Sequence, residues 1–161
     1  MRRLIGTVLL TGVCSFPVIA AQARGGAAGG SRISACSLLT RDLVMKVGTV
    51  EGKRFIDLIK PTEDQIGANG SGCEYGGIGL QINPFARADE LRQSPGKDWT
   101  RLPGVGDTAY FRDNGGRWAE LMVWTGPNHF TIQMGVPMGS TAEAIKPNTI
   151  ALANELMPKL R

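Results

Sequence analysis

Apolar and polar positions alternate most clearly between residues 108 and 136, where two turn sequences separate three runs of strand-forming residues. The first turn, at residues 113–116, contains Asn and Gly, which accept the positive φ angles of a tight hairpin. Residues 125–128 form the second turn. If Trp124 pairs with His129, one face becomes apolar: Ala119, Leu121, Val123, Phe130, Ile132 and Met134. The pattern predicts a three-stranded antiparallel meander with one side facing the core.

Apolar residues at helical spacing predict a helix before this meander. Thr40 is a good N-cap, Leu43, Val44 and Val47 follow it at helical spacing, and Gly48 suits a left-handed terminating position. We therefore expect a short helix that packs through its apolar side.

A longer helical stripe follows the meander and begins after Ser140 or Thr141, either of which is a suitable N-cap. Pro147 lies inside the stripe, so we expect the helix to restart there and Lys146 to leave helical geometry. The stripe consists of Ile145, Thr149, Leu152, Leu156 and Leu160.

The intervening chain gives weaker patterns. Residues 52–59 alternate as in a strand, residues 67–72 are typical of a loop, residues 73–83 predict one strand, and residues 86–93 predict a helical turn. Taken together, the patterns predict an α+β fold. In this fold an antiparallel sheet, with its meander around residues 108–136, is flanked by N- and C-terminal helices.

The first 23 residues have the pattern of a secretory signal peptide. Arg2 and Arg3 precede an apolar run over residues 4–21, and the small residues Ala21 and Ala23 suit a cleavage site near Ala23. We expect a flexible leader over residues 24–32 and a single domain over residues 33–161. These features predict a periplasmic or secreted protein without stable membrane insertion.

Charge and cysteine usage narrow the picture further. The formal charge of +4 includes Arg2 and Arg3, so the processed chain carries about +2, which is too little to indicate nucleic acid or an anionic membrane as partner. Cleavage also removes Cys14 and leaves Cys36 and Cys73 in an oxidising compartment, which favours a disulfide over two free thiols. Val13 is too large for lipid attachment at Cys14.

The second face of the meander mixes aromatic and polar side chains. The pairing above places these together: Trp118, Glu120, Met122, Trp124, His129, Thr131 and Gln133. One interpretation is that a helix or loops cover the aromatic part and leave the polar side chains at its rim. The other is a face that binds a ligand or partner. We favour the covered face, because two-layer folds commonly bury parts of both sheet faces.

No motif predicts catalysis, a metal or a cofactor. His129, at a predicted turn, is expected to be exposed, and Asp107 is expected to accept backbone hydrogen bonds that shape a turn. Two cysteines and one histidine do not complete a structural zinc site. The glycine clusters at residues 76–79 and 104–106 lack the helix and the Lys-Ser/Thr pair of a phosphate loop.

Several short segments carry a resemblance to a known group. The segments are Ala35-Cys36-Ser37-Leu38-Leu39-Thr40, Cys73-Glu74-Tyr75, Leu102-Pro103-Gly104-Val105-Gly106-Asp107-Thr108-Ala109-Tyr110 and the alanine-rich last helix. In this order they resemble a family of small exported actinobacterial lipoproteins that begin with Cys-Ser-Leu-Leu. The resemblance implies a PsbP-like α+β sandwich and a disulfide between Cys36 and Cys73. It implies no catalytic residues.

Three functions remain open at this point. The first is a non-enzymatic binding domain of the cell envelope, which would use the aromatic sheet face to bind a protein, a peptide or a small apolar molecule. The second is a hydrolase that uses Asp107, Glu120 or His129. The third is a structural subunit whose aromatic face is buried in its own core.

Overall fold

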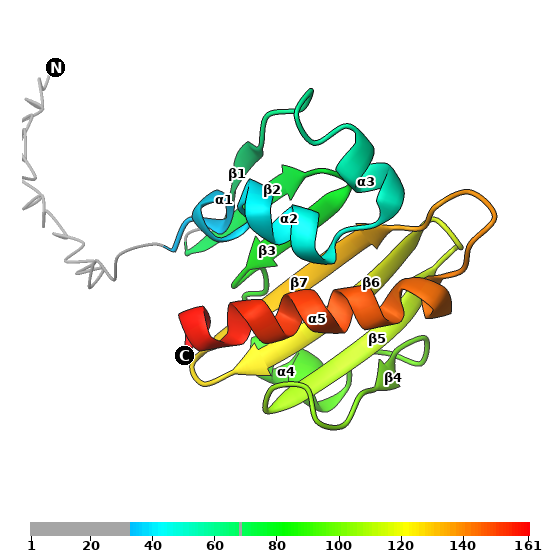
Figure 1. Cartoon of the computed structure of the whole chain (residues 1–161). Coiled ribbons are helices and arrows are strands. Elements are labelled where there is room, and N and C mark those ends of the chain that lie inside the picture. Colours follow the sequence, from blue (N-terminus) through cyan, green and yellow to red (C-terminus); the bar gives the residue numbers. More distant parts are fainter. Residues whose placement is uncertain (1–32, 68) are drawn as a thin grey trace, which may run out of the picture.

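The structure is a computed structural model that describes residues 33–67 and 69–161. Within these residues, seven strands form one antiparallel sheet in the order β1-β2-β3-β7-β6-β5-β4 (Figure 1). The strands are β1 (Thr62–Ile66), β2 (Gly70–Tyr75), β3 (Ile78–Ile82), β4 (Thr100–Arg101), β5 (Thr108–Asn114), β6 (Trp118–Thr125) and β7 (Asn128–Gly135).

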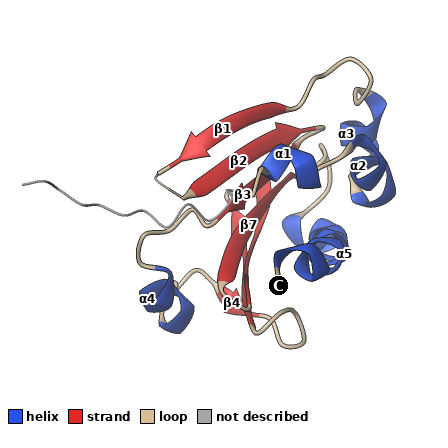
Figure 2. Ribbon diagram, turned by 90° about the vertical axis from the view of Figure 1, so that its left-hand side faces the viewer, coloured by secondary structure: helices blue, strands red, loops and turns tan. Residues whose placement is uncertain are grey.

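Helices lie on both sides of this sheet, but one side carries more of them than the other. Four of them, α1 (Ala35–Leu38), α2 (Arg41–Val47), α3 (Val50–Arg54) and α5 (Ala142–Leu160), lie on one side, and the short α4 (Ala88–Gln93) lies on the other (Figure 2). The predicted α+β class, with an antiparallel sheet flanked by N- and C-terminal helices, is confirmed. The side that carries only α4 is called the outer face below.

The main core lies between the sheet and α5. The apolar set predicted for the meander faces α5, and the predicted register is confirmed, because Trp124 pairs with His129 and Leu121 with Ile132. From α5, the buried side chains are Ala142, Ile145, Thr149, Leu152, Ala153, Leu156 and Leu160. The stripe predicted for the last helix is therefore the side that covers the sheet.

A disulfide joins the N-terminal helices to the sheet. The sulfur atoms of Cys36, in α1, and Cys73, in β2, lie 2.05 Å apart. Ser71 adds a second link, because its hydroxyl donates to the Ile33 carbonyl at 2.6 Å and accepts from the Ala35 N–H at 3.0 Å. The predicted signal peptide and leader lie outside the described residues. Among the described helices, none is both long and apolar enough to cross a bilayer.

The helix predicted after Thr40 is confirmed as α2, but it ends differently. Gly48 has φ −66° rather than a left-handed conformation. A Cβ at this position would lie 2.6 Å from the Val44 carbonyl oxygen. Close approach to the preceding turn therefore explains the glycine better than the sign of its φ angle.

The helix restart predicted at Pro147 is wrong, because α5 continues from Ala142 to Leu160. Proline lacks the N–H that would bond the Glu143 carbonyl, and this one missing bond does not end the helix. In the next turn the Thr149 hydroxyl donates to the Lys146 carbonyl at 2.8 Å. Ile145 and Thr149 are both buried against the sheet. Packing on either side of Pro147 keeps the helix continuous.

Two strand predictions are also wrong. Residues 52–59 contain the end of α3 and a turn, because Thr49 caps a short helix and only Ile56 of the alternating side chains reaches the core. Residues 73–83 form parts of two strands, since Gly76 and Gly77 turn the chain with φ angles of 60° and 72°. Part of the loop predicted at residues 67–72 belongs to β2, and β1, which is polar apart from Ile66, gave no strand pattern.

Candidate functional site

The mixed face predicted for the meander lies on the outer face of the sheet. Alternation along β6 and β7 places Trp118, Glu120, Met122 and Trp124 there with His129, Thr131 and Gln133. The face is divided into two parts. We call the part under α4 the covered half and the part over β1, β2 and β3 the open half.

Aromatic side chains fill the covered half. Tyr110, Met122 and Trp124 are buried and form a second apolar cluster, and Trp124 is only 3% exposed. The cluster is closed by three side chains from α4 and its neighbouring segments: Phe85, Leu91 and Trp99. The Tyr110 hydroxyl also donates to the Arg92 carbonyl at 2.7 Å, which holds α4 on the sheet. Trp124 and Met122 therefore belong to a covered core.

His129 is buried in the same half, which corrects the prediction of an exposed turn histidine. Its ring stacks on Phe85 and Trp124, with centroid distances of 5.5 and 6.2 Å. The Nε2 atom accepts a hydrogen bond from the Phe85 N–H at 3.1 Å, which requires an unprotonated nitrogen. Burial lowers the pKa of His129, and the negative charge of Asp89 opposes this effect. The neutral ring is thus part of the packing.

Glu120 is a buried acid at the boundary of the two halves. It is 2% exposed, and its carboxylate pairs with the Arg112 guanidinium at 2.5 Å. The same carboxylate accepts from the side-chain amides of Asn114 at 2.8 Å and Gln133 at 2.9 Å. Arg112 lies over the Trp99 ring, 4.4 Å from its centroid. Charge-assisted hydrogen bonds of this kind satisfy a buried carboxylate and fix the side chains around it.

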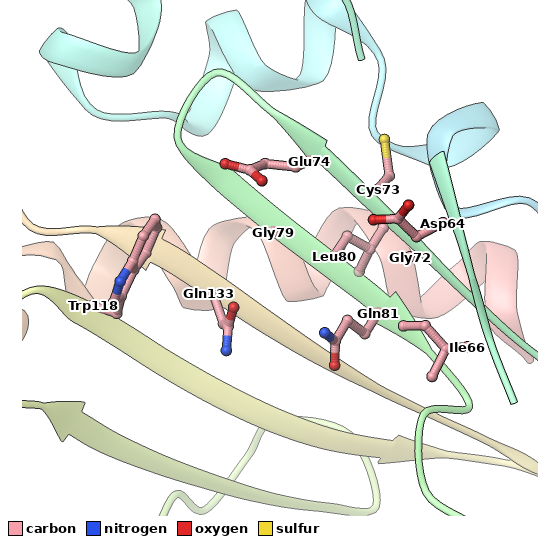
Figure 3. A pocket seen from close by; sticks show the side chains of 10 residues that line it. All are labelled: Asp64, Ile66, Gly72, Cys73, Glu74, Gly79, Leu80, Gln81, Trp118 and Gln133. Carbon is pink, nitrogen blue, oxygen red and sulfur yellow. The ribbon is translucent and has the colours of Figure 1, made fainter. Parts of the chain in front are cut away.

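The open half contains a cleft of about 240 Å³. Gly72 and Gly79 line it, so neighbouring strands β2 and β3 present backbone where side chains would otherwise stand (Figure 3). Trp118 and Gln133 lie at one end of the cleft, and Asp64 and Ile66 lie at the other. Trp118 is only partly buried, so one aromatic side chain of the predicted face reaches solvent here.

The charged side chains that line the cleft are both acidic. Asp64 and Glu74 line it, both are exposed, and its lining contains no Lys or Arg. The sequence from residue 61 to residue 86 also has no basic residue. Neither carboxylate forms an ion pair within the described residues. The cleft therefore favours groups that are positively charged or rich in hydrogen-bond donors.

Of the six predicted site residues, the structure places only Trp118 and Gln133 in this cleft. The sequence interpretation missed the residues from β1, β2 and β3. A signal for them was present in the sequence, because Gly70 and Gly72 occupy successive positions on one face of β2 and Glu74 follows on the same face. Glycine at successive positions of one strand face marks a place where other groups approach the backbone closely.

The three residues considered for hydrolysis are held in separate places. Asp107 accepts a hydrogen bond from the Gly126 N–H at 2.8 Å, which confirms its expected role in shaping a turn. Glu120 pairs with Gln133, and His129 pairs with Trp124 four residues away along β7. Among the described residues, no group of three or more His, Cys, Asp or Glu side chains is arranged to hold a metal ion.

Comparison of the chain with known protein families, curated proteins and solved structures gives no match. The resemblance to the actinobacterial lipoprotein family therefore stays a prediction, and the fold class rests on the structure itself.

Proposed function

We propose that this chain is a non-enzymatic binding domain of the cell envelope and that it binds its partner at the cleft in the open half. The single observation that carries the proposal is the cleft itself, which Gly72 and the partly exposed Gly79 line together with Trp118. Concave sites with an aromatic wall and a few polar groups are typical of ligand binding. The covered half, by contrast, supports an internal role for Met122 and Trp124.

The partner that fits this cleft is a peptide segment carrying Lys or Arg. Asp64 and Glu74 provide the complementary charge, and the Trp118 ring can stack on a guanidinium or attract an ammonium group. Gln81 offers an amide that can donate to, and accept from, a peptide backbone, and Gln133, whose amide nitrogen already donates to Glu120, offers its side-chain oxygen as an acceptor. A small apolar molecule would leave these polar groups unpaired, so a basic peptide is the better match.

Export is part of the proposal. It is supported by the predicted signal peptide and by the cysteine pair, whose sulfur atoms lie at bonding distance. Disulfides persist in oxidising compartments, which include the periplasm and the medium. The proposed binding domain would therefore meet its partner outside the cytoplasm.

Titration with a tetra-arginine amide, followed by ¹H–¹⁵N NMR, tests the proposal. The chain has three tryptophans, Trp99, Trp118 and Trp124, whose indole N–H signals can be assigned by replacing each residue with Phe. We expect the peptide to shift the Trp118 signal and leave that of Trp124 in place. A tetra-glutamate amide should move neither signal. Shifts confined to Trp124, or no shift with tetra-arginine, would contradict binding at the cleft.

A pair of neighbouring acids provides a matched control. Asp64 lines the cleft, whereas Glu63 lies beside it on β1 with the opposite strand alternation. Asp64→Asn should weaken tetra-arginine binding about fivefold to tenfold, as expected for loss of one near charge. Glu63→Gln should change it less than twofold. Equal losses in the two variants would indicate a diffuse acidic field rather than a site.

A further inference from the structure

A second exposed surface differs from this cleft in its chemistry, because it consists of apolar side chains with basic neighbours. Residues 50–60 include four large apolar side chains that reach solvent. Val50 is 84% exposed and Leu58 is 82% exposed, while Phe55 and Ile59 are each close to half-exposed. We call these four side chains the apolar corner. They belong to α3 and to the turn that follows it, at one corner of the molecule (Figure 1).

The apolar corner is held in place by the fold. Ile56, in the middle of the segment, is buried, and its carbonyl accepts a hydrogen bond from the Tyr75 hydroxyl at 3.3 Å. Thr49 caps α3 through the Gly52 N–H, and a Cβ at Gly52 would lie 2.2 Å from the Gly76 carbonyl oxygen. The segment is thus anchored on its inner side while its apolar side chains point outward.

The charges around the apolar corner are predominantly positive, and its cations are not engaged in ion pairs within the described residues. Lys53, Arg54 and Lys60 take part in none of the ion pairs formed by the described residues. The acid Asp57 is already neutralised, because Arg41 binds both of its oxygens at 2.7 and 3.2 Å. Only Glu51 opposes the three free cations within residues 50–60. The small net charge of the whole chain hides this local excess.

We propose that the apolar corner inserts into the interface of a bilayer that contains anionic lipids. Apolar side chains at the tip of a turn can enter the boundary between headgroups and acyl chains, and flanking Lys and Arg side chains then reach the lipid phosphates. Each basic residue near an anionic surface strengthens binding about fivefold. The four side chains and three cations match this combination of apolar and electrostatic attraction. The binding is peripheral and reversible, and involves no membrane-spanning segment.

Vesicle flotation with residues 24–161 tests this proposal. This part of the chain retains the complete sheet, both apolar clusters and the disulfide, and it omits the apolar run at residues 4–21, which would bind membranes by itself. We expect the protein to float with vesicles of phosphatidylcholine and phosphatidylglycerol at a 3:1 ratio. It should bind pure phosphatidylcholine vesicles at least tenfold more weakly, and 0.5 M salt should release it.

Matched substitutions distinguish binding through the apolar corner from nonspecific hydrophobic adsorption to vesicles. Phe55→Ser with Leu58→Ser should lower binding to the anionic vesicles at least tenfold, and Leu58→Ser alone should lower it severalfold. Lys53→Gln with Lys60→Gln should lower it about tenfold or more. Met138→Ser is the control, because Met138 is a 96% exposed apolar side chain outside residues 50–60. The Met138→Ser variant should bind the anionic vesicles like the unchanged protein. Circular dichroism verifies that each variant is folded.

Other outcomes would overturn the proposal. Absence of binding to the anionic vesicles would do so directly, as would an equal loss in Met138→Ser and Leu58→Ser. Sedimentation velocity tests the alternative that a second copy of this chain binds at the apolar corner. If the chain self-associates without binding vesicles, and Leu58→Ser makes it monomeric, the apolar corner is a contact between copies and not a lipid site.

Discussion

The two halves of the outer face are built from the same sheet yet differ in what fills them. In the covered half, large side chains such as Tyr110 and Trp124 stand on the strands, and α4 closes over them. In the open half, the outer face of β2 and β3 carries Gly72 and Gly79 instead of large side chains, and a cleft remains. The difference shows that an aromatic sheet face is not by itself a binding face. Burying large apolar side chains is favourable, so another part of the same chain can pack over them.

The largest effect should come from the tryptophan of the covered half. Trp124→Ala should reduce the free energy of unfolding by about 3–5 kcal/mol, because it removes a fully packed aromatic side chain. Trp118→Ala, at a partly exposed position, should cost less than about 1 kcal/mol. Urea denaturation measures both values. Equal losses in the two variants would remove the distinction between the halves.

The disulfide should matter mainly for the open half. Replacing Cys36 and Cys73 with Ser should reduce the free energy of unfolding by about 2–4 kcal/mol. Because Cys73 lies in β2, we expect amide hydrogen exchange to quicken first in β1 and β2, and later in β5 and β6. Uniform acceleration across the sheet would mean that the disulfide supports both halves alike.

The covered half should be the part that responds to mild acid. Burial lowers the pKa of His129 below its ordinary value of 6.5, so the unfolded chain takes up a proton more readily than the folded one. Stability should therefore be fully present above about pH 6.5 and fall as the pH drops below that value. Thermal unfolding between pH 8 and pH 5 measures this. His129→Gln, which can still accept from the Phe85 N–H, should remove the pH dependence between pH 6.5 and the lowered pKa.

The smallest effect is expected at the boundary. Thr131 pairs with Gln81, which lines the cleft, and with Met122, which is covered. Its buried hydroxyl has no hydrogen-bond partner among the described residues. Thr131→Val keeps the shape and removes the unpaired group, so it should stabilise the fold by up to about 1 kcal/mol. A loss above about 1 kcal/mol, measured in urea, would mean that the hydroxyl is satisfied in solution.

The sequence was most informative where one periodic pattern extends over many residues. The register of Trp124 with His129 and the buried stripe of α5 could both be predicted, because alternation and helical spacing determine them locally. The helix end at Gly48 and the continuity through Pro147 could not, because each depends on contacts with an adjacent turn or a facing sheet.

The candidate site was harder to predict than the fold. Whether Trp118 or Trp124 is accessible depends on where α4 lies, and a six-residue helix has no pattern that reveals its packing partner. The residues of β1 were missed for a different reason. An edge strand that is exposed over nearly its whole length lacks the apolar alternation by which strands are recognised.

The order of the strands also affects when the molecule can fold. β3 lies between β2 and β7, although β7 follows it by about fifty residues in the chain. As the chain emerges from a ribosome or a membrane pore, β3 has no second neighbour until residues 128–135 appear. Contacts between distant segments are slow to form. The N-terminal half should therefore stay incomplete until synthesis is nearly finished, which keeps the chain in a state that can still be threaded through a narrow channel.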